Sequence, residues 1–334
     1  MRSSHKKNTA MLAGKLAAAV LVIAAAVLIF MLLKDDEPDF LKPYEAENQA
    51  ADISQSFQID NELFASDLCV IMDSDAQDPA DALDAGAALI FNITDNQVVY
   101  NQSAFDRLYP ASITKVMTYL VAVKYGDLSQ MVTITDAMLD LDSASSVAGL
   151  QAGDVISMND LLYGMLMASG NDAAQAIALT VGGTQEGFAD LMNQEALRLG
   201  ATGTHFVNAH GLTDEQHYTT AYDIYLILNE ALKDERFVDI ISTPEHTAYY
   251  TGPGGSELER TWQAGTWYAS GEVTAPEGYT VVGGKTGTTQ AAGYCMALYS
   301  RDSAGKEYIS VVLNSPSRDV LYYNLNALFS KITN

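Results

Sequence analysis

The stretch YPASITKVMT, residues 109–118, places a serine and a lysine three positions apart. On a helix, Ser112 and Lys115 would lie on one face about one turn apart. A serine hydroxyl is a weak nucleophile until a base removes its proton, and a lysine whose pKa is lowered by burial can be that base. The pair therefore suits acyl transfer, although Ser-x-x-Lys taken alone is more typical of a capped or surface-exposed helix start.

Two further motifs carry groups that could assist such a reaction. Ser169-Gly170-Asn171 separates two apolar helical stretches and would present a hydroxyl and an amide from a tight turn. Lys285-Thr286-Gly287 lies in a strand-like stretch, where the glycine leaves the backbone open to an approaching substrate. Each motif alone is also typical of an ordinary turn or strand end, so neither is specific by itself.

The order of the three motifs is more specific than any one of them. Ser-x-x-Lys, Ser-x-Asn and Lys-Thr-Gly follow one another here at a helix start, an inter-helix turn and a strand. This order is the signature of penicillin-binding proteins and class A β-lactamases. The chain resembles that superfamily and, within it, the serine-type D-alanyl-D-alanine carboxypeptidases, the low-molecular-mass penicillin-binding proteins.

Longer blocks around the motifs extend this resemblance. They cover about residues 87–315 and comprise YPASITKVMTYL, LLYGMLMASGNDAAQAIA, THFVNAHGLTDEQHYTTAYDI and GGKTGTTQAAGYC. The resemblance implies a β-lactamase/transpeptidase-like fold and a hydrolase that needs no cofactor. Its implied partners are the pentapeptide stem of peptidoglycan as substrate and β-lactams as covalent inhibitors.

The resemblance also implies a role for each catalytic group. Ser112 would attack the penultimate D-alanine carbonyl, and Lys115 would take its proton. Ser169, with Lys285 nearby, would relay a proton to the departing D-alanine. Lys285 would in addition help to keep Lys115 neutral through like-charge repulsion.

Substrate contacts are implied for a second group of residues. Asn171 would hold the substrate amide, and Thr286 would bind the terminal carboxylate beside Lys285 and Gly287. The backbone N–H groups of Ser112 and Thr288 would form the oxyanion hole.

Several alternatives share these residues. A D,D-endopeptidase or a transpeptidase would need the same catalytic groups. A serine β-lactamase of class A would add a Glu-x-x-Leu-Asn segment, which LMNQEALRLGATGTHFVN does not supply. A non-enzymatic binding module is disfavoured because all three motifs are intact. For His210 and His217 we expect structural roles, because a lysine already fills the role of base.

The elements that must position these residues follow from periodicity. Residues 87–101 alternate about a Thr-Asp-Asn turn and predict a β-hairpin. Helices are expected over 112–125, on both sides of the 169–171 break, over EGFADLMNQEALRLG and TAYDIYLILNEALKD, and at the C-terminal end. The stretches YTVVGGKTGTT, AAGYCMALYSR and KEYISVVLNS predict consecutive antiparallel strands. The expected fold is α+β, an antiparallel β-sheet flanked by helices with an inserted all-helical lobe.

Composition narrows the class of protein. The 334 residues are 48% hydrophobic and carry 42 acidic against 18 basic side chains, a formal net charge of -24. No basic surface is available to neutralise phosphates, so nucleic acid is not an expected partner. The five histidines form no His-Glu-x-x-His pattern and the two cysteines supply no metal-site spacing, so no metal is predicted. Cys69 and Cys295 are expected to be separate buried side chains.

The N-terminal region predicts a membrane location. Residues 1–15 are basic, and Leu16–Leu33 lack any charged or polar side chain. At ~1.5 Å per residue this run reaches about 27 Å, just enough to cross a bilayer core. We expect a cytoplasmic N-terminus at 1–15, a retained anchor at 16–33, an acidic stalk at 34–66 and an extracellular or periplasmic catalytic domain at 67–334. A cleaved signal peptide is the alternative. This sequence ends at Asn334, so attachment through the N-terminus is expected, not through a C-terminal amphipathic helix.

Overall fold

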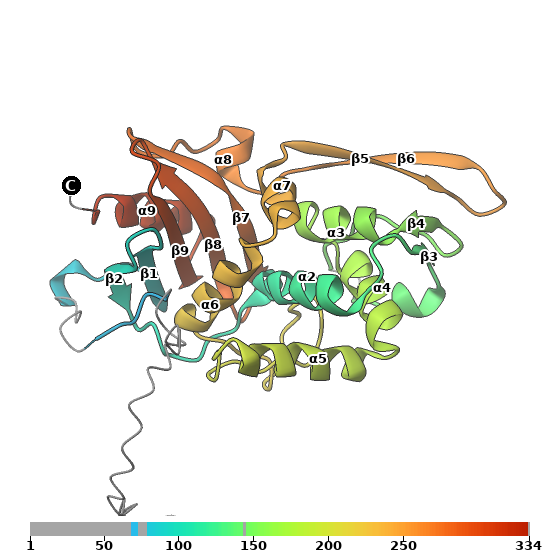
Figure 1. The fold of residues 1–334 in the computed structure, drawn as a ribbon, viewed down its shortest axis with the longest axis horizontal. Coiled ribbons are helices and arrows are strands. Elements are labelled where there is room, and N and C mark those ends of the chain that lie inside the picture. Colours follow the sequence, from blue (N-terminus) through green and yellow to red (C-terminus); the bar gives the residue numbers. More distant parts are fainter. Residues whose placement is uncertain (1–67, 73–78, 143–144, 333–334) are drawn as a thin grey trace, which may run out of the picture. The chain divides into compact units, whose positions relative to one another are not determined.

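A five-stranded antiparallel sheet is the centre of the computed structural model, which describes residues 68–72, 79–142 and 145–332. The first two strands form the predicted hairpin, and the last three form the predicted meander. Strand β1 also pairs with β9, which brings the two ends of the described chain together (Figure 1). Across the sheet the order is β2 (Gln97–Gln102), β1 (Ala87–Asn92), β9 (Glu307–Ser315), β8 (Gly293–Asp302) and β7 (Tyr279–Thr289).

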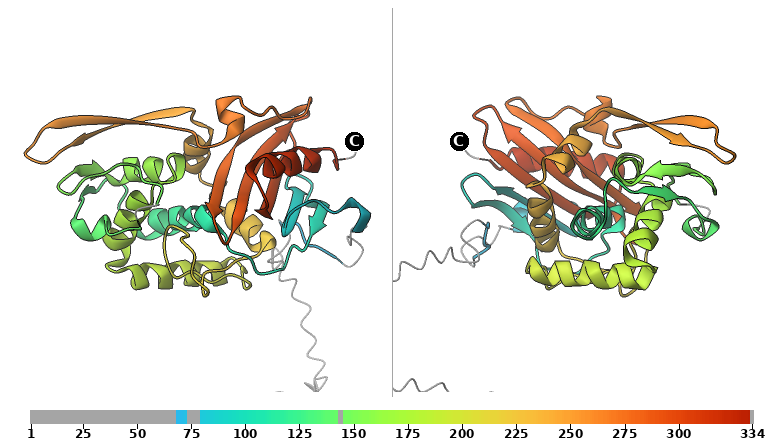
Figure 2. Two further views of the ribbon diagram at one scale, coloured as in Figure 1. Left: turned by 180° about the vertical axis from the view of Figure 1, so that it is seen from behind. Right: turned by 45° about the vertical axis from the view of Figure 1, so that its right-hand side comes forward.

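Both faces of this sheet are covered. Every residue of β1 is buried, because successive side chains point to opposite faces and each face has its own core. Leu89 and Phe91 belong to one core, in which the Phe91 ring meets the Tyr225 ring edge-on at 4.7 Å. Ala88 and Ile90 belong to the other core, which is completed by the C-terminal helix. The sheet is therefore a middle layer between helices (Figure 2).

The helices divide between the two sides of the sheet and a lobe beside it. The C-terminal helix α9 covers one face, and α2 and α6 belong to the core of the other. Helices α3, α4 and α5 lie in the lobe beyond α2 (Figure 1). Their bounds are α2 (Thr114–Tyr125), α3 (Met158–Met167), α4 (Asn171–Gly182), α5 (Gln185–Arg198), α6 (Ala221–Ala231), α7 (Glu235–Ser242), α8 (Trp267–Ser270) and α9 (Arg318–Phe329). Within the described residues, the short 3-10 helices are η2 (Pro79–Asp81), η3 (Ala111–Ile113) and η4 (Asp136–Met138).

Side-chain caps begin several of these helices. The hydroxyl of Ser157 accepts the N–H of Asp160 at the start of α3. The hydroxyl of Thr220 does the same for the N–H of Asp223 at the start of α6. The helix break at 169–171 is also confirmed, since α3 ends at Met167 and α4 begins at Asn171.

A second, four-stranded sheet was not predicted. Its order is β3 (Met131–Thr133), β4 (Val155–Ser157), β5 (Glu245–Thr251) and β6 (Glu257–Gln263). The hairpin β5–β6 forms a long arm beside the helical lobe (Figures 1 and 2). Strands β3 and β4 have three residues each, and most residues of the arm are exposed or half-buried. The short strands and the arm therefore carry no clear hydrophobic period. The helical lobe is therefore accompanied by strands, a correction to the all-helical expectation.

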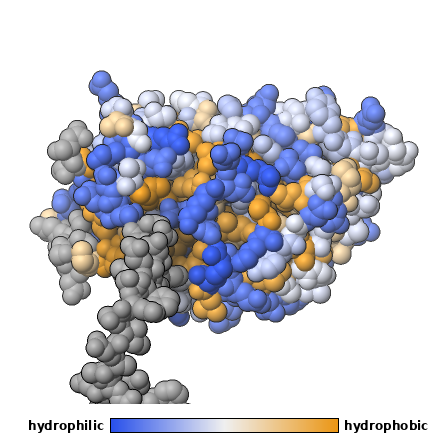
Figure 3. Space-filling view, in the orientation of Figure 1, coloured by the Kyte–Doolittle hydropathy of each residue, from blue (hydrophilic) through white to orange (hydrophobic). Residues whose placement is uncertain are grey.

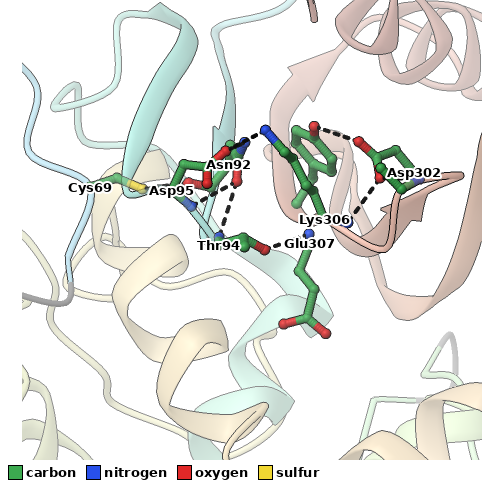
Figure 4. A network of polar contacts seen from close by, with 9 residues as sticks. Cys69, Asn92, Thr94, Asp95, Asp302, Lys306 and Glu307 are labelled. Atoms are coloured by element: carbon green, nitrogen blue, oxygen red, sulfur yellow. Dashed lines mark hydrogen bonds and ion pairs between the residues drawn. The ribbon is translucent and has the colours of Figure 1, made fainter. Parts of the chain in front are cut away.

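The turn between β1 and β2 is tied to the turn between β8 and β9 (Figure 4). The side-chain oxygen of Asn92 accepts the N–H groups of Thr94 and Asp95, each at 3.0 Å. The Lys306 ammonium lies 2.7 Å from the Asp95 carboxylate. The N–H of Glu307 donates to the Thr94 hydroxyl at 2.8 Å. These contacts hold β1 and β9 in register at the end of the strand pair where β1 ends and β9 begins.

The observed fold confirms the predicted α+β class. In the orientation of Figure 1, hydrophilic side chains and smaller hydrophobic areas alternate over the surface (Figure 3). Both cysteines are buried and free, as expected.

Across residues 68–72, 79–142 and 145–332, no helix combines the length and the apolar character needed to cross a bilayer. The predicted anchor at 16–33 and stalk at 34–66 lie outside the described residues.

Candidate active site

The predicted nucleophile lies in η3, which leads directly into α2. Ala111 and Ile113 are buried, whereas Ser112 between them is partly exposed. Pro110 precedes this turn and, because its φ is restricted by the ring, favours the change of direction into the helix. The turn is therefore anchored by its neighbours while it presents one hydroxyl outward.

Strand β7 packs directly against this turn, and a glycine permits the contact. A Cβ atom added at Gly287 would lie 2.8 Å from the carbonyl oxygen of Pro110 and 3.0 Å from the backbone nitrogen of Ser112. Both distances are shorter than a carbon atom tolerates. The Gly of the Lys-Thr-Gly motif is thus the residue that lets the edge strand reach the nucleophile.

Lys115 is fully buried and has three polar neighbours. Its Nζ lies 3.0 Å from the Ser112 hydroxyl, 2.7 Å from the side-chain oxygen of Asn171 and 2.9 Å from the backbone oxygen of His210. Burial lowers the pKa of Lys115 well below its ordinary value, and the positive charge of Lys285 lowers it further. The carboxylate of Asp172 acts in the opposite direction.

These three neighbours determine what a neutral Lys115 would do. A neutral amine keeps two N–H bonds and one lone pair. The oxygens of Asn171 and the His210 backbone can only accept, so they take the two N–H bonds. The lone pair then faces the Ser112 hydroxyl, which can donate its proton. The geometry is that of a general base beside its nucleophile.

A second hydrogen-bonded pair joins the other two motifs. The Nζ of Lys285 donates to the Ser169 hydroxyl at 3.0 Å and to the Thr286 backbone oxygen at 3.0 Å. Burial lowers the pKa of Lys285 to about 7. Ser169 has a φ of 55°, uncommon for a residue with a side chain, which places its hydroxyl at the break between α3 and α4.

The start of α4 is held by the residue after Asn171. The buried carboxylate of Asp172 accepts the N–H groups of Ala148, Gly149 and Leu150 at 2.6, 2.8 and 3.0 Å. Because this carboxylate binds three consecutive amides, it fixes the loop that precedes β4 against the helix. Asn171 itself donates its backbone N–H to the oxygen of Ser146 in the same loop. Asp172 was not among the predicted site residues.

The remaining predicted residues line strand β7. Thr286 is partly exposed and Thr288 is exposed, and both lie on the edge strand that contacts η3. At the end of β7, the Thr213 hydroxyl donates to the Thr289 hydroxyl at 3.0 Å. This bond connects the loop around His210 to the strand.

The structure therefore brings the predicted residues together in two linked sets. Lys115 joins Ser112 to Asn171, Lys285 joins β7 to Ser169, and Gly287 packs against the turn that carries Ser112. Among the described residues, no group of three or more His, Cys, Asp or Glu side chains is placed to hold a metal ion.

The loop 207–217 contributes residues that sequence reasoning had not placed in the site. His210 supplies a backbone oxygen to Lys115, and burial lowers the pKa of its ring to about 3. Gly211 adopts a φ of +88°, and a Cβ atom there would lie 1.9 Å from the carbonyl oxygen of Ala111. The sequence signal for this loop was the block THFVNAHGLTDEQHYTTAYDI, in which Gly211 is the residue that needs this space.

Comparison with known proteins agrees with this geometry. The family model described as "Peptidase S11: D-alanyl-D-alanine carboxypeptidase" matches residues 73–317. The chain belongs to the peptidase S11 family. Its predicted resemblance to low-molecular-mass penicillin-binding proteins is thereby confirmed.

Individual relatives of this family carry the same kind of name. The chain is 32% identical over 64% of its length to a D-alanyl-D-alanine carboxypeptidase, DacF, of Bacillus subtilis, and 35% identical over 71% of its length to DacC of Escherichia coli. These matches cover 54% and 58% of the two relatives, so the chain spans little more than half of their length. A solved variant of the DD-transpeptidase of Streptomyces K15 is 29% identical, with a TM-score of 0.69, and the match covers 75% of this chain and 98% of that one.

Proposed function

We propose that this chain is a serine D,D-carboxypeptidase that removes the terminal D-alanine from peptidoglycan stem peptides. The observation that carries the proposal is the contact between the Ser112 hydroxyl and the amine of Lys115, 3.0 Å apart. The amine is buried, which lowers its pKa and favours the neutral form that can accept the proton. Family membership supports the same chemistry.

In the first step the Ser112 oxygen bonds to the carbonyl carbon of the penultimate D-alanine. Its proton passes to Lys115, and the carbonyl oxygen takes a negative charge. The N–H groups of Ser112 and Thr288 face this oxygen as the oxyanion hole. Removing one such donor typically costs about 10²- to 10³-fold in rate, so the hole supplies a few kcal/mol.

In the second step the bond to the departing nitrogen breaks. The leaving D-alanine needs a proton on its amine. The proton that Lys115 took from Ser112 is relayed to it through the Ser169 hydroxyl, to which Lys285 donates, so that Lys115 is neutral again. The side-chain oxygen of Asn171 binds Lys115, and its side-chain nitrogen holds the substrate amide. A water molecule then attacks the acyl-enzyme. The neutral Lys115 takes a proton from the water and returns it to the Ser112 oxygen as the bond between that oxygen and the acyl carbon breaks.

The substrate ends in a carboxylate, and β7 offers groups that recognise it. Lys285 supplies a cation and Thr286 a hydroxyl, next to the unobstructed backbone of Gly287. A β-lactam carries a carboxylate and a reactive carbonyl at a similar spacing. We therefore expect penicillins to acylate Ser112 and remain bound for longer than the natural acyl group.

The place of action follows from the N-terminal sequence. Stem peptides lie outside the cytoplasmic membrane, and the run at 16–33 predicts a single-pass anchor with residues 1–15 in the cytoplasm. The catalytic domain, predicted to begin near residue 67, would then face the extracellular or periplasmic side.

The decisive test measures the product and the nucleophile in one preparation. The full chain in detergent should release D-alanine from a defined pentapeptide and be labelled by a fluorescent penicillin. Ser112→Ala should lose both signals. Ser317→Ala, which removes a capping hydroxyl at α9, is a matched control that should keep both. A protein that is folded but neither labelled nor active in the wild-type form would refute the proposal.

A transpeptidase or D,D-endopeptidase is the second candidate, because the solved relative is named a DD-transpeptidase. Adding an acceptor amine or a cross-linked dimer to the assay separates these activities from hydrolysis. A serine β-lactamase would instead turn over penicillin many times per second, which the lifetime of the labelled enzyme measures directly.

A further inference from the structure

One peptide bond carries both a held carbonyl and the proposed oxyanion-hole donor. It joins Ala111 to Ser112, with the Ala111 oxygen on one side and the Ser112 N–H on the other. In a planar trans peptide these two bonds point in opposite directions, so whatever fixes the oxygen also aims the N–H. Ala111 has a φ of 48°, a conformation that persists in a non-glycine residue only when its surroundings hold it.

The Ala111 oxygen is held by Thr114. The Thr114 hydroxyl donates to it at 2.8 Å, and the Thr114 backbone N–H points to it as well. Both groups are buried, so no exchange with bulk solvent competes for the carbonyl. Gly211 closes the remaining side, since even a methyl group there would overlap the oxygen.

The direction of the Thr114 hydroxyl is set by His217. The backbone N–H of Val207 donates to Nδ1 of His217 at 3.1 Å. An amide N–H can only donate, so Nδ1 accepts and the neutral ring carries its proton on Nε2. That Nε2 lies 2.8 Å from the Thr114 hydroxyl and donates to it. The hydroxyl proton of Thr114 is then left to donate to Ala111.

We propose that His217 and Thr114 are positioning residues that hold the Ala111–Ser112 peptide so that its N–H points at the oxyanion. This inference rests on the proposed function, because it assigns a task within the acylation step. The chain of hydrogen bonds runs in one direction, from Val207 through His217 and Thr114 to Ala111. A carbonyl that accepts such bonds polarises its own peptide, which makes the N–H on the other side a stronger donor.

The test compares two variants of Thr114 with the wild type. Thr114→Val keeps the shape and removes the hydroxyl, and it should lower the acylation rate constant for penicillin about 10- to 100-fold, somewhat less than the loss of a whole oxyanion donor. The affinity of the initial noncovalent complex should stay within about twofold. Thr114→Ser restores the hydroxyl and should recover acylation to within about threefold of wild type.

A boronic acid inhibitor supplies a readout that a merely structural role would not move. Its boron forms a tetrahedral adduct with the Ser112 oxygen, and one boronate oxygen occupies the oxyanion hole. Boronate affinity should therefore fall in Thr114→Val by the same factor as the acylation rate. The pH dependence of acylation should keep its midpoint, because the base Lys115 is untouched.

Thr118→Val is the matched control. Thr118 is also buried in α2, and its hydroxyl donates to the Ala209 oxygen at 2.6 Å instead of to Ala111. It should lose stability like Thr114→Val but keep its acylation rate. If Thr114→Val does not fold, His217→Leu breaks the preceding link, and His217→Gln, whose amide nitrogen can replace Nε2, should restore it.

Several results would overturn the inference. One is a folded Thr114→Val or His217→Leu that acylates at the wild-type rate and binds boronate with wild-type affinity. Another is a loss of acylation rate in Thr118→Val equal to that in Thr114→Val. A third is a shift in the pH midpoint of acylation in Thr114→Val. In each case a wild-type enzyme that still releases D-alanine would leave the proposed function standing. Loss of both penicillin labelling and D-alanine release in the wild type would instead refute the proposed function itself.

Discussion

Replacing Gly287 by alanine tests whether the close approach of β7 to the nucleophile matters for catalysis. The new Cβ would lie 2.8 Å from the Pro110 oxygen, 3.0 Å from the Ser112 nitrogen and 3.1 Å from the Ala111 Cβ. Since ordinary contacts of a Cβ begin at about 3.4 Å, the strand and the turn must separate by roughly half an ångström. The polar atoms of Ser112 and Lys285 move apart with them.

The expected losses follow from this displacement. Crowding in a packed region costs about 1–3 kcal/mol of unfolding free energy. A misplacement of about 1 Å at a reacting centre can cost about 10²-fold in rate, so half of that distance should lower acylation about 10-fold or more. The loss of activity should thus exceed what partial unfolding at the assay temperature explains.

The assay follows penicillin labelling by stopped-flow fluorescence and unfolding by thermal denaturation in the same buffer. Gly86→Ala is the control, because its Cβ would lie 2.9 Å from the Asn314 Cβ, a similar clash between the residue that precedes β1 and strand β9. It should lose comparable stability and label at the wild-type rate. If Gly287→Ala labels as fast as wild type, or if Gly86→Ala slows equally, the strand-to-turn contact is not what positions the nucleophile.

Four further outcomes are expected. Lys115→Ala removes the base and should slow penicillin labelling about 10²- to 10⁴-fold, and labelling at the wild-type rate would disprove its role. Lys285→Gln removes a charge that lowers the pKa of Lys115, so the pKa of Lys115 should rise. Because acylation requires the neutral amine, the increase of the acylation rate with pH should shift to higher pH. An unchanged midpoint would contradict this coupling. The Lys285 cation is lost as pH rises through about 7, so kcat/KM for a peptide with a free C-terminal carboxylate should fall above that pH more than for its C-terminal amide. Thr220→Ala removes the cap of α6 and should cost about 1 kcal/mol in denaturant unfolding without changing the labelling rate.

The parts of the fold that could be predicted are those whose hydrophobic period is strong. The hairpin of β1 and β2, the meander of β7 to β9 and the helices around the 169–171 break all have regular apolar spacing and turn residues at their ends. The arm of β5 and β6 lacked such a signal. Tyr249 is 71% exposed there while Tyr250 beside it is 7% exposed, so two identical aromatic residues gave no indication of which face was buried.

The candidate site shows the same division. Ser112, Lys115 and Lys285 were found because their types and their motif context indicate chemistry. Asp172 and the backbone oxygen of His210 were not, since a carboxylate that binds three amides and a carbonyl that binds an amine have no signature in the sequence. The role of a backbone atom depends only on where the chain has folded.

By itself, the sequence determined which chemical groups this protein possesses, in what order, and on what kind of element each one lies. Residue type settles whether a group can be a nucleophile, a base or a cation, and local spacing settles whether it begins a helix or ends a strand. Only the tertiary structure decided that the Ser112 hydroxyl meets a buried Lys115, and that β7 comes close enough for Lys285 to reach Ser169. Desolvation and close approach are properties of packed surroundings, and those surroundings are assembled from segments that lie far apart in the chain.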